Sequence, residues 1–290
     1  MGSVELGQIV VNALLLSGIL AVVALGFSLV WGIMNIVNLA HGPFIMLGAY
    51  VTFWLYELWG VDPFLSIPIA MLALFVVGFA IQRVLINQII RAPLLVTFLL
   101  TFGLEILIVN LVNYFFKADM RSVMTPYSGT GFNLGGVRVP YIRLAALGLA
   151  LVLVYALSWF LGNTRAGNAI RATGMDIEAA QLTGVKVGTI YALTFAIGAA
   201  MAGAAGSLLS MVASFDPTLG SSYTQRAFVI CVLGGLGNVL NVLIGAAIFA
   251  FVEVFVGSRI PQLSQAVTFA LLVLLLVLRP QGIAGRAFYV

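Results

Sequence analysis

Long apolar runs dominate the pattern of hydrophobic and polar positions along the chain. They cover roughly residues 9–31, 33–56, 64–82, 93–116, 140–161, 189–213, 223–257 and 264–278. The runs do not alternate apolar and polar residues, as the strands of a transmembrane barrel would. A helix needs about 20 apolar residues to cross a bilayer. The pattern therefore predicts an all-α fold, a polytopic transmembrane helix bundle that occupies residues 1–290 as one domain.

The seventh run is too long for one crossing and contains a dense group of glycines. Gly234, Gly235 and Gly237, followed by Asn238, are expected to break the helix there. Splitting the run gives nine crossings and places the two termini on opposite sides of the membrane. The longest polar stretches, 117–139 and 162–188, are expected as loops at the membrane surface.

Composition supports a membrane protein. Of the 290 residues, 62% are apolar and 8% are charged, whereas a soluble domain has about 25% charged residues. The net charge of +4 comes from scattered Lys and Arg without a basic cluster, so no nucleic-acid partner is expected. No basic segment precedes the first apolar run, which predicts a retained span and not a cleaved signal peptide. A multi-pass membrane protein follows.

Catalytic motifs are missing from the sequence. Neither Lys117 nor Lys186 follows a glycine, so there is no phosphate-binding loop. One histidine, His41, supports neither a Ser-His-Asp set nor a metal site. The chain is therefore expected to be no enzyme and to hold no cofactor or metal. Energy for any transport must come from another subunit or from an ion gradient.

Polar residues interrupt the second apolar run. Asn35, Asn38 and His41 recur every three residues and would lie along one side of a helix, and Gly42-Pro43 should break or kink it. Irregular backbone at membrane depth occurs only inside protein or beside a water-filled cavity. Either these side chains line a pathway or they satisfy the broken helix. The glycine break near 234 is its counterpart, which hints at an internal repeat.

Two acidic residues fall inside apolar runs. Glu105 lies at the middle of 93–116, and Glu253 lies deep in 223–257. An ionised side chain at the bilayer centre costs roughly 2.5–3.5 kcal/mol, so each must face the bundle interior, pair or be neutral. Structural hydrogen bonding, gating and a proton relay are the three hypotheses for them.

The polar stretch at about 163–188 contains a short predicted helix. Asp176 can cap it, Glu178 suits its first turn, Ala179 and Ala180 favour it, and Gly184 can end it. A solvated interfacial loop and a docking element for a soluble partner are both compatible with this pattern.

Four motifs resemble one family of membrane proteins. The segment EAAQLTG matches the EAA-x-x-x-G core of the loop by which permease subunits of ABC importers bind their ATPase subunits. RAGNAIRATGMDIEAAQLTGV, NIVNLAHGPFIMLGAY, FVICVLGGLGNVLNVLIGA and LRPQGIAG are similar to segments of the branched-chain amino acid permeases. The similarity runs from about residue 25 to 285.

The resemblance implies a function and a set of partners. The chain would be the transmembrane permease subunit of an ATP-driven importer for branched-chain or related amino acids. It would lie in the plasma (inner) membrane of a prokaryote. Two ATPase subunits, which bind ATP-Mg, would grip 163–188 in the cytoplasm, where the C-terminus would also lie. A second permease subunit, homologous or identical, would complete the pathway, and an extracellular or periplasmic binding protein would deliver substrate.

The sequence departs from this family at Gly42-Pro43, where relatives often have Gly-Glu, and near Asn241, where they often have a small residue. Relatives of this architecture also carry urea and short amides, so that substrate class is an alternative. The other alternative is an ATP-independent secondary transporter or channel, with 163–188 as an ordinary loop.

Overall fold

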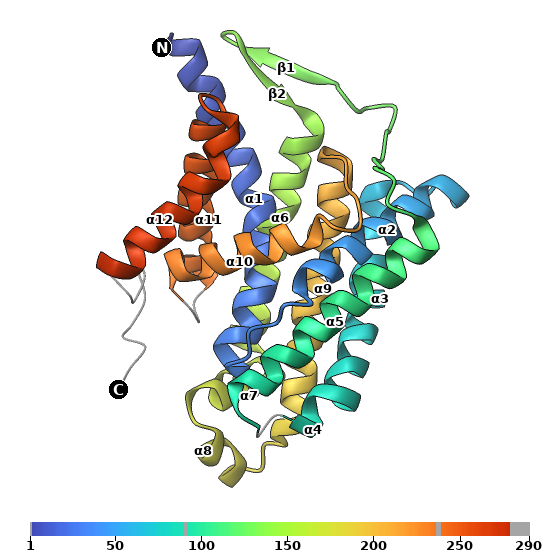
Figure 1. Ribbon diagram of the computed structural model, residues 1–290, viewed down its shortest axis with the longest axis vertical. Coiled ribbons are helices and arrows are strands. Elements are labelled where there is room, and N and C mark those ends of the chain that lie inside the picture. Colours follow the sequence, from blue (N-terminus) through green and yellow to red (C-terminus); the bar gives the residue numbers. More distant parts are fainter. Residues whose placement is uncertain (1, 90–91, 236–238, 279–290) are drawn as a thin grey trace.

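Helices form most of the computed structural model, in which residues 2–89, 92–235 and 239–278 are described (Figure 1). The expected all-α membrane bundle is confirmed. The elements in chain order are α1 (Ser3–Met34), α2 (His41–Trp59), α3 (Pro63–Ile81), η1 (Gln82–Ile86), α4 (Asn87–Ile89), α5 (Leu94–Phe116), β1 (Gly131–Leu134), β2 (Val137–Pro140), α6 (Tyr141–Asn163), α7 (Arg165–Met175), α8 (Ile177–Leu182), α9 (Val187–Val212), α10 (Gly220–Gly234), α11 (Val239–Gly257), η2 (Pro261–Leu263) and α12 (Ser264–Leu278).

Six helices of the described chain are long and apolar enough to cross a membrane. They are α1, α3 with its continuation to Ile89, α5, α6, α9 and α11. Six of the nine expected crossings are thus found among the described residues. The break after Met34 leaves α2 with 19 residues, and these include too many polar groups for an apolar span. Helix α10 has 15 residues, about 22 Å, against a hydrocarbon core of about 30 Å.

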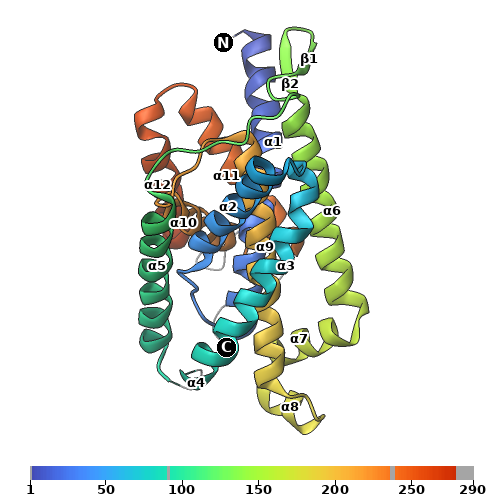
Figure 2. The same cartoon turned by 90° about the vertical axis from the view of Figure 1, so that its right-hand side faces the viewer.

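Helices α1 and α9 form the centre of the bundle (Figure 2). Their most apolar windows are 83% and 89% buried, whereas those of α3, α5, α6 and α11 are 22–28% buried. Small residues allow the central backbones to approach closely: Gly198 of α9 lies against Gly26 of α1, and Gly203 lies against Gly48 of α2. The peripheral helices leave broad apolar faces exposed, as expected of helices that contact lipid.

The N-terminus and a β-hairpin lie at one end of the molecule, and α8 lies at the other (Figures 1 and 2). Strands β1 and β2 pair antiparallel around Gly135-Gly136, whose φ angles are 58° and 90°. A two-residue turn with positive φ at both positions matches the twist of a hairpin. The sequence analysis expected only a loop over 117–139, so this hairpin was missed.

Candidate functional site

The first broken helix lies between α1 and α2. Helix α1 ends at Met34, Asn35 takes the left-handed conformation with φ 53°, and α2 begins at His41. The expectation of a helix broken at Gly42-Pro43 is wrong, because the break precedes Pro43. That proline lies in the first turn of α2, where a backbone N–H has no helical partner in any case. Asn35, Asn38 and His41 therefore do not share one helix face.

Hydroxyl groups from two other helices hold the break. Thr101 Oγ1 on α5 donates to the carbonyl of Val37 at 3.1 Å. Thr224 Oγ1 on α10 accepts from the amide of Gly42 at 2.8 Å and lies 3.4 Å from the carbonyl of Leu39. Buried backbone groups without partners are costly at membrane depth, so these two threonines stabilise the irregular segment. The sequence analysis missed both, and a hydroxyl inside an apolar run is the signal that points to them.

The polar residues of the break point in different directions. His41 is fully buried and its Nε2 lies 2.8 Å from the carbonyl of Val23 on α1, so Nε2 is the donor. Asn38 is also buried, and its Oδ1 accepts from the amide of Ala40 at 3.1 Å. Asn35 alone is exposed. Within the break, Asn38 and His41 thus complete internal hydrogen bonds, whereas Asn35 faces outward.

The second break separates α10 from α11, so the expected split of the seventh apolar run is confirmed. Gly235 has φ 86°, a conformation that suits glycine, and its amide donates to the carbonyl of Cys231 at 2.9 Å. Gly234 packs so closely against the backbone of Asn241 on α11 that a side chain there would overlap it. The predicted residues Gly237 and Asn238 lie outside the described residues.

Both acidic residues within the membrane segments contact α10. Glu253 of α11 pairs with Arg226 at 2.9 Å, and that guanidinium also lies 4.9 Å from the ring centre of Tyr223. Glu105 of α5 accepts a hydrogen bond at its Oε1 from the hydroxyl of Ser221. The two carboxylates therefore have different partners, one a cation and the other a neutral hydroxyl. Ser221 and Arg226 are further residues that the sequence analysis did not single out.

The segment from α7 to Gly184 forms the end of the molecule opposite the hairpin (Figures 1 and 2). Asp176 caps α8 by accepting from the amide of Ala179 at 3.0 Å, and Glu178 lies exposed in its first turn. Gly184 follows with φ 84° and nothing within 4 Å of the position of a side chain, so backbone conformation alone requires glycine there. The predicted capped helix and its glycine end are confirmed as local structure.

The exposed surface of α8 differs from the one that the motif indicates. Ala180 is buried and packs inward, whereas Ala179 is exposed. Met175 and Leu182 are 88% and 90% exposed, and Ile177 is also exposed. Large apolar side chains that stand free at one end of a bundle indicate a surface that a partner covers.

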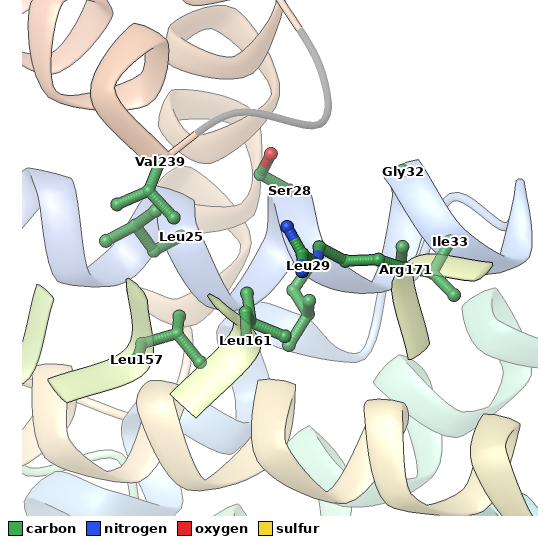
Figure 3. Close-up of a pocket in the computed structure, with 9 residues that line it drawn as sticks. All are labelled: Leu25, Ser28, Leu29, Gly32, Ile33, Leu157, Leu161, Arg171 and Val239. Atoms are coloured by element: carbon green, nitrogen blue, oxygen red, sulfur yellow. The ribbon is translucent and has the colours of Figure 1, made fainter. Parts of the chain in front are cut away.

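Cavities connect this end segment to the first break. One of 390 Å³ is lined by Trp31, Gly32, Ile33, Met34 and Asn35 of α1 and its end, by Thr173, Gly174, Met175, Asp176 and Ile177 of α7–α8, and by Tyr191 of α9. A neighbouring one of 70 Å³ lies between α1, α6, α7 and α11. In Figure 3, Arg171 extends from α7 toward Leu29 of α1 across this second cavity. Residues of the α7–α8 segment and the residues where α1 ends therefore line the same cavity.

Comparison with known proteins gives one consistent family. Residues 9–276 match the family described as the permease component of the branched-chain amino acid transport system. The high-affinity branched-chain amino acid transport system permease protein BraD of Pseudomonas aeruginosa is 31% identical over 96% of this chain and 95% of its own length. LivH of Escherichia coli is 30% identical over 95% and 94%, and LivH of Methanocaldococcus jannaschii is 25% identical over 97% and 94%. No solved structure matches the chain.

Proposed function

The chain belongs to the family of permease components of branched-chain amino acid transport systems, and we propose that it forms part of the pathway of an ATP-driven importer of branched-chain amino acids. Members of this family are transport permeases and not enzymes. Its apolar helices make the chain a multi-pass membrane protein. In the proposed importer a second permease subunit, homologous or identical, completes the pathway.

One structural observation, besides membership of the family, supports an ATP-driven mechanism. The capped helix α8 and the break at 35–40 share the 390 Å³ cavity, so a contact made outside the bundle reaches the irregular backbone inside it. A channel or gradient-driven transporter has no need of a protruding helix with exposed Met175 and Leu182. A permease driven by a soluble motor needs such a surface and a link from it to the pathway.

The roles of the partners follow from the two ends of the molecule. We assign the α7–α8 end, about 163–188, to the cytoplasm, where two ATPase subunits bind it and supply ATP-Mg chemistry. The hairpin end then faces the outside and meets the substrate-binding protein. We also assign the C-terminus to the cytoplasmic side, because the segment LRPQGIAG resembles the C-terminal cytoplasmic segment of this family. Nucleotide-driven closure of the motor would push α8 toward α1 and change the geometry at Asn35, which switches access from one side to the other.

Transport in reconstituted vesicles tests the proposal. Vesicles that contain this chain with its ATPase subunits, second permease subunit and binding protein should accumulate radiolabelled leucine only with ATP inside the compartment that holds the motor. The chain alone should neither hydrolyse ATP nor accumulate leucine under an ion gradient. ATP-independent accumulation by the chain alone would support a secondary transporter or channel, and uptake of urea or short amides in place of leucine would assign it to that substrate class.

A further inference from the structure

A polar row lies on the surface formed by α5 and α10. Glu105 of α5 is half-buried and accepts a hydrogen bond from Ser221 of α10, which ties the two helices together. Gln225 lies one turn further along α10 on the same face and is exposed. Figure 1 shows that α10 runs across the bundle while α5 is inclined differently, so this face belongs to two differently inclined helices.

Glu105 differs from the other intramembrane acid in what neutralises it. Glu253 has Arg226 at 2.9 Å, whereas no basic side chain in the described part of the chain lies within ion-pairing distance of Glu105. Over those same residues, Ser221 is the only hydrogen-bond donor to the Glu105 carboxylate, and it contacts Oε1. The second oxygen, Oε2, is therefore available to another donor.

The polar row cannot face lipid without a large cost. Ionisable and amide side chains within membrane segments almost always face a bundle interior or a water-filled route. Seven residues after Ser221, on the same helical face, Phe228 stacks on Trp31 of α1 with ring centres 5.1 Å apart. Trp31 in turn lines the 390 Å³ cavity beside α8. Along this face the Glu105 carboxylate is followed by the Gln225 amide and then by the Trp31–Phe228 ring pair. Trp31 borders the 390 Å³ cavity.

We propose that Glu105 binds the α-ammonium group of the amino acid as it passes between the permease subunits, and that the Trp31–Phe228 ring pair next contacts its apolar side chain. This inference rests on the proposed function. An ammonium group donates to Oε2 and supplies the positive charge that the described residues do not provide there. Ser221 holds the carboxylate in place, which makes it a positioning residue.

Substitutions separate binding from structure. In the complete transporter, Glu105→Gln keeps an acceptor for Ser221 and removes the charge, so leucine uptake should fall about tenfold to a hundredfold, the range expected when a hydrogen bond to a charged group is lost. Glu105→Asp keeps the charge and should restore a large part of the uptake. Ser221→Ala removes only the anchoring hydrogen bond and should lower uptake less than Glu105→Gln.

Chemical protection tests the ammonium contact without measuring transport. A hydrophobic carbodiimide should modify Glu105 in the assembled complex, and Glu105→Gln should remove that labelling. Leucine and leucinamide, which carry the ammonium group, should slow the labelling when present in excess. The hydroxy acid 4-methyl-2-hydroxypentanoate, which lacks it, should not.

Wild-type uptake by Glu105→Gln, or equal protection by the hydroxy acid, overturns the inference while leaving the proposed function intact. Equal losses of uptake and thermal stability in Glu105→Gln and Ser221→Ala would also overturn it, because they indicate a purely structural contact. Failure of the wild-type complex to transport leucine overturns both.

Discussion

The break between α1 and α2 and the α7–α8 segment are both irregular, yet their polar and apolar groups are arranged in opposite ways. Within the break, carbonyl and amide groups are satisfied by Thr101 and Thr224 from other helices, and His41 is fully buried. In the α7–α8 segment the backbone is capped locally by Asp176, and large apolar side chains such as Leu182 are exposed.

The difference separates a region that maintains its own shape from a region that needs a partner. Satisfied, buried polar groups fix the break in one geometry. Exposed apolar side chains contribute to stability only when another protein covers them. Both regions line the 390 Å³ cavity. Substitutions in the break should therefore affect the isolated chain, and substitutions in α8 should affect only the assembled transporter.

The largest effect on the isolated chain is expected at Gly42. A side chain there would overlap the carbonyl of Gly220 and the hydroxyl of Thr224, where α2 meets α10. Gly42→Ala should destabilise the bundle by about 3 kcal/mol or more through overpacking and abolish leucine uptake. Thermal unfolding of the detergent-purified chain measures the first effect and vesicle uptake the second.

Gly103→Ala is the matched control for Gly42→Ala. Gly103 lies on an exposed part of α5 with nothing within 4 Å of the added carbon. Its substitution should leave uptake unchanged and stability unchanged or slightly increased, because alanine favours a helix. Equal unfolding temperatures for the two variants would show that the α2–α10 contact is loose.

Gly184→Val tests the α7–α8 segment, the region that is expected to need a partner. The φ angle of 84° is strained for a β-branched residue, at a cost of about 1–3 kcal/mol confined to the turn after α8. Uptake and co-purification of the ATPase subunits should be lost, while the unfolding temperature of the isolated chain stays the same. Gly162→Val, at the same end of the molecule but without positive φ, should retain the ATPase subunits.

A smaller effect on stability is expected from Thr224→Val, which keeps the shape of the side chain. The amide of Gly42 would lose its acceptor, at a cost of about 1–3 kcal/mol. Thr194→Val is the control, since that buried hydroxyl bonds only to the carbonyl of Ile190 in its own helix. Equal unfolding temperatures for the two variants would show that the Thr224 hydroxyl does not stabilise the break.

The smallest expected effect belongs to Leu182→Ser. This side chain is 90% exposed, so the isolated chain should unfold at the wild-type temperature. Its affinity for the ATPase subunits should fall about tenfold, equivalent to losing about 1.4 kcal/mol of apolar burial. Leu134→Ser, on the hairpin at the opposite end, should leave that affinity unchanged. Equal affinities for both variants would exclude Leu182 from the interface.

The sequence predicted the elements that depend on local patterns. The helix starting after Asp176, the glycine end at 184 and the split at 234–235 all follow from capping and backbone preferences of single residues. The family followed from motifs and is confirmed by the match over residues 9–276.

Features that depend on distant contacts could not be predicted in this way. The position of the first break depends on Thr101 and Thr224, which are 64 and 185 residues away from the carbonyls they contact. Ala180 looks equivalent to Ala179 in the sequence, and only packing of the end segment shows that it is buried. A short apolar run also does not reveal whether its helix stands upright or, like α10, crosses the bundle (Figure 1).

Cross-linking from α8 tests the coupling role most directly. A cysteine introduced at Ala179 should cross-link to an ATPase subunit in the assembled transporter, since this side chain is exposed, whereas the native Cys231 is buried. A cysteine at the buried Ala180 should react slowly and cross-link little. The account predicts an ATPase product from position 179 whose yield changes when nucleotide is added. Cross-links from 179 only to the binding protein, or to no soluble subunit at all, would contradict it.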